Sequence, residues 1–242
     1  MSGEFVQILP YVLGATGAGI LAGLLPLIWA PNVHARSAIQ HFAAGVVVAA
    51  VASDLIPEVE KIGRPAGILA GFAAGGVFMI GLKWLVVNFE QKHKGKHKLP
   101  IGIAAAAAVD TLVDGALISA GFSTGQQLGS LLAIALAIEL FFLTLSVGSE
   151  FRKSKAKGWQ GVAVTTAIAL LLVVGALIGF LLFRDVSQPT LAIVLSFGAA
   201  ALIYLIAEEL LVEAIEAEEN LFSTAMLFAG FLVLLALKLF TR

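Results

Sequence analysis

Long apolar stretches alternate with short polar segments along the whole chain. Eight of these stretches are each long enough to cross a hydrocarbon core, which takes about 20 helical residues. They cover approximately residues 5–29, 37–58, 66–89, 100–122, 127–150, 159–183, 190–213 and 220–240. Open sheets are not stable in lipid, and the alternating pattern of barrel strands is absent from the sequence. The pattern therefore predicts an all-α bundle of eight transmembrane helices, forming a single transmembrane domain over residues 1–242.

The composition agrees with an integral membrane protein in contact with lipid. Hydrophobic residues make up 60% of the chain and charged residues only 13%, far from the usual values of a soluble domain. The net charge of -1 gives no indication of a nucleic-acid partner. Met1 to Phe5 lack the basic region that opens a cleavable signal peptide, so we expect the first helix to stay in the mature protein. The absence of cysteine excludes disulfides and thiolate metal ligands.

Lysine and arginine are distributed unevenly between the two sides of the predicted bundle. The segments after the first, third, fifth and seventh stretches carry nine of them, and the opposite side carries five. The nine are Arg36, Lys92, Lys94, Lys96, Lys98, Arg152, Lys153, Lys155 and Lys157, and the five are Lys61, Arg64, Arg184, Lys238 and Arg242. The positive-inside rule then places the basic side in the cytoplasm and both termini outside the cell membrane.

Three acidic residues lie in the middle of apolar stretches. Asp110 and Asp114 belong to the fourth stretch and Glu139 to the fifth. A carboxylate facing lipid costs several kcal/mol, so acids at this depth usually face a bundle interior, a partner or an ion pathway. At a rise of about 1.5 Å per residue, Asp110 lies roughly 15 Å and Glu139 roughly 18 Å from the start of its helix. All three residues are therefore predicted near the membrane midplane.

The spacing of these acids predicts a cluster of three carboxylates. Asp110 and Asp114 are four residues apart and share a helix face, and a short loop could bring Glu139 opposite them. Such a cluster needs protons or a divalent cation, because its charges repel one another in a low dielectric. Oxygen ligands suit Mn²⁺, Mg²⁺ or Ca²⁺, and Zn²⁺ and Fe²⁺ also accept carboxylates.

The alternative is a structural role, in which each acid is protonated or bonded to a nearby hydroxyl group and joins helices together. The candidate hydroxyl groups belong to Thr111, Ser119, Thr144 and Ser146.

A second acidic pattern occurs twice. The segment from Asp54 to Glu58 resembles that from Glu209 to Glu213, and the two helices that carry them run in opposite directions. Inverted repeats of this kind are common in secondary transporters, so we predict that helices 1–3 and 6–8 are related by inverted topology. Asp54 and Glu58 then lie near the outer face, and Glu208, Glu209 and Glu213 near the inner face. Acids at both pathway mouths would concentrate cations, although ordinary solvated helix ends would look the same.

Three motifs resemble those of the ZIP (Zrt/Irt-like, solute carrier 39) metal transporters. They are FAAGVVVAAVASDLIPE in the second helix, GALIGF in the sixth and ALIYLIAEELLVEA in the seventh. The resemblance covers nearly the whole chain, including the eight helices and a histidine-containing loop between the third and fourth. It implies a homodimer that moves divalent cations such as Zn, Mn, Fe or Cd as substrates, with no prosthetic group. It also implies an elevator mechanism, in which helices 1, 4, 5 and 6 move against helices 2, 3, 7 and 8.

The chain departs from this family in the predicted metal site. Asp110 takes the place of the histidine in the family's HNxPEG motif, and Asp114 takes that of the glutamate. Glu139 is the one possible ligand that remains of the family's HExPE motif, and Leu143 and Leu172 replace acids of a second site. The resemblance therefore implies a single metal site of Asp110, Asp114 and Glu139, with a greater preference for hard ions than a histidine-bearing site has.

Two other classes of function compete with transport. A non-transporting relative would keep the fold and bind a metal ion or protons in a structural or regulatory role. An enzyme is not expected, because the D-x-x-D-G spacing of phosphatidyltransferases and the GxGD element of intramembrane aspartyl proteases are both absent. Lys83 lies inside the third apolar stretch, where we expect it to reach the interface or to pair with an acid.

Overall fold

The computed structural model describes residues 2–29, 31–92, 100–154, 157–211 and 221–240. Within these ranges the secondary structure is helical throughout, and no strand is formed. Eight helices are long and apolar enough to cross a membrane. The prediction of an all-α protein with eight spans is confirmed, and the protein is a multi-pass membrane protein.

The spans agree with those predicted from the sequence to within a few residues at their ends. The first is α1 (Ser2–Leu24) with η1 (Leu25–Leu27), and the second is α2 (Val33–Ala50), η2 (Val51–Leu55) and α3 (Ile56–Ile62). Next come α4 (Pro65–Lys92), α5 (Ile101–Thr124), α6 (Gln126–Lys153) and α7 (Gly158–Phe183). The last two spans are α8 (Gln188–Leu205) with η3 (Ile206–Leu210), and α10 (Leu221–Phe240). The η2 and η3 segments are single π-helical turns inside otherwise α-helical spans.

Local signals in the sequence account for several of the helix ends. The side chain of Asn32 accepts a hydrogen bond from the backbone N–H of Ala35 at 2.8 Å and so caps the start of α2. Gly63 caps the end of α3, and Pro65 begins α4 two residues later. Gly125 alone separates α5 from α6, so these two helices are antiparallel neighbours. This short connection brings the acids of the two helices to similar depths.

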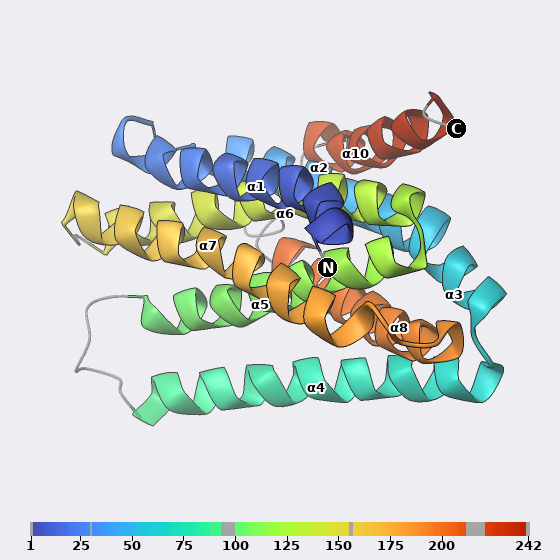
Figure 1. Cartoon of the computed structure of the whole chain (residues 1–242). Helices are drawn as coiled ribbons and strands as arrows, with labels where there is room; N and C mark the ends of the chain where they lie inside the picture. The colour runs from blue at the N-terminus through green and yellow to red at the C-terminus, as the bar shows by residue number, and fades with distance from the viewer. Residues whose placement is uncertain (1, 30, 93–99, 155–156, 212–220, 241–242) are drawn as a thin grey trace.

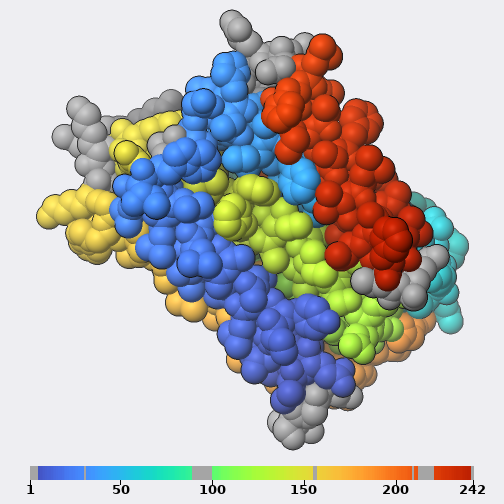
Figure 2. All heavy atoms as spheres, turned by 90° about the horizontal axis from the view of Figure 1, so that it is seen from above, coloured from blue at the N-terminus to red at the C-terminus, as the bar shows by residue number. Residues whose placement is uncertain are grey.

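The helices form two groups of four spans. In the first group α5 packs along α7 and α1 along α6, with further contacts between α1 and α7 and between α5 and α6. In the second group α2 packs along α10 and α4 along α8. The groups meet where α2 contacts α6 and where α5 contacts α8, and α4 lies at one edge of the molecule (Figure 1). Seen from above, α6 lies between α1 and α10 on one face (Figure 2).

Glycines allow the closest of these pairs to bring their backbones into contact. A Cβ atom at Gly175 of α7 would lie 2.1 Å from the Leu112 carbonyl oxygen of α5. In the second group, a Cβ atom at Gly45 of α2 would lie 1.9 Å from the Leu227 carbonyl oxygen of α10. Small residues at such positions are the usual means by which membrane helices pack closely.

The packing pairs follow the pattern that an inverted repeat generates. If spans 1–3 correspond to spans 6–8 and span 4 to span 5, then the α1–α6 pair corresponds to α7–α5. The α2–α10 pair likewise corresponds to α8–α4, and all four pairs are close-packed. The two π-helical turns also occupy corresponding spans, the second and the seventh, and each includes an acidic residue. The repeat therefore extends from the acidic motifs to the arrangement of the helices.

Candidate metal centre

Asp110, Asp114 and Glu139 meet inside the first group of helices. Each offers a carboxylate oxygen, and these three oxygens all lie within 4.8 Å of one another. The residues are 6%, 2% and 1% exposed respectively. The cluster predicted from the spacing of the acids is thus formed, with Asp110 and Asp114 one turn apart on α5 and Glu139 on the adjacent α6.

The separation of the oxygens fits a single metal ion. Carboxylate oxygens bind divalent cations at roughly 2.0–2.6 Å, so two ligands of one ion are at most about 5 Å apart. The three oxygens lie within that limit. An all-carboxylate set is a hard donor set, which suits Mn²⁺ or Mg²⁺ and is also accepted by Zn²⁺.

The neighbouring hydroxyl groups bind backbone carbonyl groups of their own or an adjacent helix. The Thr111 hydroxyl donates to the Ala107 carbonyl oxygen at 2.8 Å, and the Ser119 hydroxyl donates to that of Ala176 in α7 at 2.7 Å. The Thr144 hydroxyl lies 2.8 Å from the carbonyl oxygen of Gly19 in α1. Because each hydroxyl has a single proton to donate, these three contribute their protons to carbonyl groups and not to the acids. This observation weakens the part of the structural alternative in which Thr111, Ser119 and Thr144 donate to the acids.

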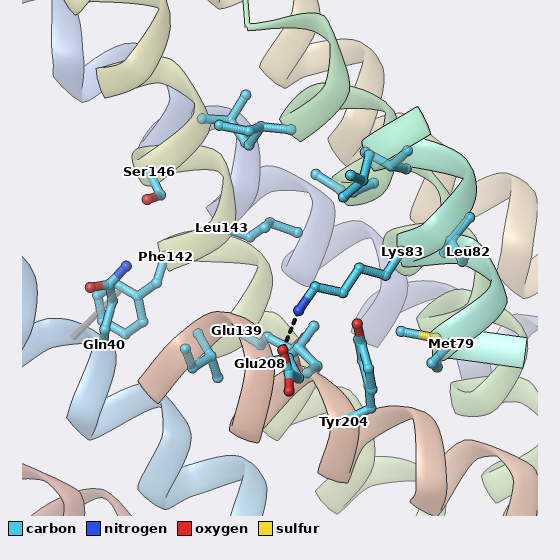
Figure 3. Close-up of a pocket in the computed structure, with 18 residues that line it drawn as sticks. Gln40, Met79, Leu82, Lys83, Glu139, Phe142, Leu143, Ser146, Tyr204 and Glu208 are labelled. Atoms are coloured by element: carbon cyan, nitrogen blue, oxygen red, sulfur yellow. Dashed lines mark hydrogen bonds and ion pairs between the residues drawn. The ribbon is translucent and has the colours of Figure 1, made fainter. Parts of the chain in front are cut away.

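A cavity of about 230 Å³ reaches the cluster at Glu139. Its other polar lining residues include Gln40, Lys83, Ser146 and Glu208, contributed by α2, α4, α6 and η3 (Figure 3). The lining lies in the halves of the spans that adjoin residues 30–36, 93–99, 154–157 and 212–220. The first three of these segments carry the basic residues, and the fourth is acidic. The cavity therefore approaches the carboxylates from the side that the sequence predicts to be cytoplasmic.

The acids predicted at the inner mouth are only partly described. Glu208 of η3 lines the cavity and forms an ion pair with Lys83 of α4, so the expectation that Lys83 pairs with an acid is confirmed (Figure 3). The side chain of Glu209 and the whole of Glu213 lie outside the described residues, as does the histidine-containing loop at 93–99.

The outer acids differ from their predicted role. Asp54 of η2 is buried, and its carboxylate lies 2.8 Å from the Lys238 ammonium of α10. It is therefore not open to solvent in this conformation, because η2 packs it into the α2–α10 contact. Glu58 of α3 pairs with Lys61 at 2.7 Å and lies at a solvated helix end. In this conformation Asp54 is buried and paired, and its role at an outer mouth stays a prediction.

Sequence reasoning missed the role of Lys238. From the sequence, Lys238 is only one of the basic residues on the predicted outer side. The structure places its ammonium beside Asp54, with its side chain 12% exposed. A usable signal was present in the inverted repeat. If the third helix corresponds to the eighth, Lys83 has Lys238 as its counterpart, and Glu208, the acid that pairs with Lys83, directly precedes Glu209, the counterpart of Asp54.

Comparison with known proteins adds no family assignment. No protein-family model matches the chain, and no curated protein has a significantly similar sequence. The architecture and the site define the class on their own. Eight apolar spans around a buried carboxylate cluster that a cavity reaches from one side fit a membrane transporter.

Changes of Asp110→Asn and Glu139→Gln test the cluster as a cation site. Each change keeps the shape of the side chain and removes its charge, so a metal ligand is lost while the packing is preserved. A bound ion stabilises the parent by RT ln(1 + [L]/Kd), which is about 2.7 kcal/mol at a hundredfold excess over Kd. We expect both variants to lose most of this stabilisation in thermal unfolding with and without Mn²⁺ or Zn²⁺.

The matched control is Glu58→Gln, which removes a carboxylate from a helix end outside the cluster. It should keep the full metal-induced shift. Retention of that shift by both Asp110→Asn and Glu139→Gln would exclude these acids as ligands.

Proposed function

We propose that this chain is a secondary transporter of divalent metal cations, a divergent protein of the ZIP type. The observation that carries the proposal is the meeting of Asp110, Asp114 and Glu139 within 4.8 Å in the interior of a bundle of apolar spans. Acids inside a membrane are energetically costly, so three of them at one depth usually serve a function. The motifs in the second, sixth and seventh helices support the family, and the buried site supports the type of substrate.

Charge favours a divalent ion as the substrate. Three carboxylates in a low dielectric repel one another, and a divalent cation offsets two of the three charges in one binding event. The donor atoms are all oxygen, and the imidazole that a histidine-bearing site would offer to Zn²⁺ is absent from the cluster. We therefore propose that Mn²⁺ or another hard ion competes here better than at such a site, although Zn²⁺ binds more tightly to a given set of ligands.

The distribution of the ligands supports an elevator mechanism. All three acids belong to α5 and α6, which pack with α1 and α7 in the first group of helices. A movement of this group against the second would carry the complete site, with no ligand left behind. Inverted repeats provide the two related arrangements that alternating access needs.

Two ion pairs between corresponding helices support the same mechanism. Lys83 and Glu208 lie on the cavity side, where their side chains are 51% and 44% exposed. Lys238 and Asp54 lie on the opposite side, where their side chains are 12% and 7% exposed. We propose that the buried pair seals the outer side in this conformation, and that the two pairs exchange exposure when the protein opens outward.

The alternative is a non-transporting protein that binds a metal ion with the same fold. Binding alone does not distinguish the two, because both need the carboxylate cluster. Only movement of the ion across the membrane distinguishes a transporter from a binding protein. The homodimer and the outer location of both termini remain predictions that the family resemblance and the basic residues supply.

Flux into proteoliposomes is the direct test of transport. We expect the parent to move Mn²⁺ and Zn²⁺, and Glu139→Gln to reduce the flux at least tenfold, since about 1.4 kcal/mol of lost ion affinity already gives that factor. Glu60→Gln, which removes an exposed acid of α3 outside both the cluster and the predicted mouths, should transport at the parent rate. In a competition experiment, Zn²⁺ flux is measured with Mn²⁺ or Mg²⁺ added as a competitor. We expect Mn²⁺ to inhibit the Zn²⁺ flux.

A parent that binds metal but shows no flux would favour the binding protein. Exclusive selection of Zn²⁺ would contradict the argument from hard ligands.

Labelling of a single cysteine tests the proposed seal, and the natural absence of cysteine makes the parent a clean background. Ser146→Cys places a thiol in the cavity lining. Lys238→Met should leave Asp54 buried without its cation, a change that typically costs about 3–5 kcal/mol in the sealed state. The population should therefore shift outward, and the labelling rate of the cavity cysteine should fall tenfold or more.

Two variants serve as controls. Lys238→Arg keeps the positive charge beside Asp54. Lys61→Met removes a positive charge on the same side of the membrane, from the exposed ion pair between Lys61 and Glu58. Both should label at the parent rate. An unchanged rate in a folded Lys238→Met variant would show that the buried pair does not seal the outer side.

A further inference from the structure

A second cavity, of about 220 Å³, lies where η1, the last turns of α6 and the first turns of α7 meet. We call it the α7 pocket. It shares no lining residue with the cavity that reaches Glu139, so it is a separate feature of the molecule. It lies at the basic end of the bundle, between helices of the first group.

Positive charge is concentrated at the α7 pocket. Arg152 and Lys157 line it, and none of its described lining residues is acidic. Arg152 donates a hydrogen bond to the Pro26 carbonyl oxygen, which holds its guanidinium over the pocket, and the guanidinium has further N–H groups to donate. Gly158 also lines the pocket and begins α7, so the positive end of the helix dipole adds to the two side chains.

Aromatic residues indicate the depth of the α7 pocket in the membrane. Trp159, in the first turn of α7, is 67% exposed, and Trp29, just after η1, is 47% exposed. Tryptophan is enriched at the membrane–water interface, where its ring lies at the level of the lipid headgroups. The pocket therefore opens at headgroup depth on the side with more basic residues.

The lining also has an apolar part that an inorganic anion would not use. Pro26, Leu27 and Val162 contribute to the wall below the two basic side chains. A phosphate group with a glycerol and acyl chains attached matches this division, because its charge meets the basic residues and its apolar part meets the wall. A free phosphate ion would match only the charged half.

We propose that the α7 pocket binds the phosphate of an anionic phospholipid headgroup. Basic pockets between transmembrane helices on the cytoplasmic side are typical sites for anionic headgroups. A lipid bound here contacts η1, α6 and α7 together and so fixes one end of the helix group that carries the carboxylate cluster. The proposal does not depend on metal transport.

Thermal unfolding of the full chain in an uncharged detergent tests this proposal. The probes are a short-chain phosphatidylglycerol, a phosphatidylcholine with the same chains, and inorganic phosphate. We expect saturable stabilisation by phosphatidylglycerol alone. Lys157→Gln should weaken its affinity about fivefold, and Arg152→Gln with Lys157→Gln roughly thirtyfold, because each basic residue near the membrane surface contributes about 1 kcal/mol.

Lys153→Gln is the matched control. Lys153 is exposed, adjoins Arg152 and pairs with Glu150, and it does not line the α7 pocket. Its removal should leave the affinity unchanged. If the double variant does not fold, Lys157→Gln alone decides, since it retains the hydrogen bond between Arg152 and Pro26.

Three results would overturn the proposal. An equal effect of Lys153→Gln and Lys157→Gln would show general attraction to a basic surface. Equal stabilisation by phosphatidylcholine would show that the headgroup charge is not recognised. Equal stabilisation by inorganic phosphate would show a site for a free anion and not for a lipid.

Discussion

The repulsion among three buried carboxylates is the constraint on which the rest of this structure depends. Asp110, Asp114 and Glu139 bring their oxygens within 4.8 Å of one another, and all three side chains are buried. Such a group is stable only when protons or a cation offset its charge. A close-packed bundle is needed to hold the acids at that separation. The glycine contacts between α5 and α7 and the single-residue connection between α5 and α6 provide it.

The second use of charge in this protein is to connect the outer helices to the π-helical turns. Lys83 of α4 pairs with Glu208 of η3, and Lys238 of α10 pairs with Asp54 of η2. A π-helical turn changes the direction of the side chains in a span, and such turns are frequent at functional sites. The two pairs join corresponding helices of the repeat, but their side chains are unequal in exposure. A protein that alternates between two related states should expose one pair and bury the other in each state. The difference in exposure between the two pairs agrees with one such state.

The sequence was sufficient for the spans and for the cluster because both follow from local rules. Apolar length predicts a span, and a spacing of four residues places Asp110 and Asp114 on one face of α5. Such local rules do not predict that Lys238 is the partner of Asp54. Lys238 lies in another helix far along the chain, and only the packing of α2 on α10 brings the two together. The α7 pocket is beyond local rules for the same reason: in the sequence Arg152 and Lys157 are only two of several basic residues after the fifth stretch, and the pocket forms where three elements meet.

The central claim is that one divalent ion is held by these three carboxylates. A crystal structure of the protein grown with Mn²⁺ tests it most directly through anomalous scattering at the manganese edge. The account predicts one well-occupied anomalous peak per chain, within about 2.6 Å of oxygens from Asp110, Asp114 and Glu139. Two well-occupied peaks near the midplane, or a peak that none of these three residues ligates, would contradict it.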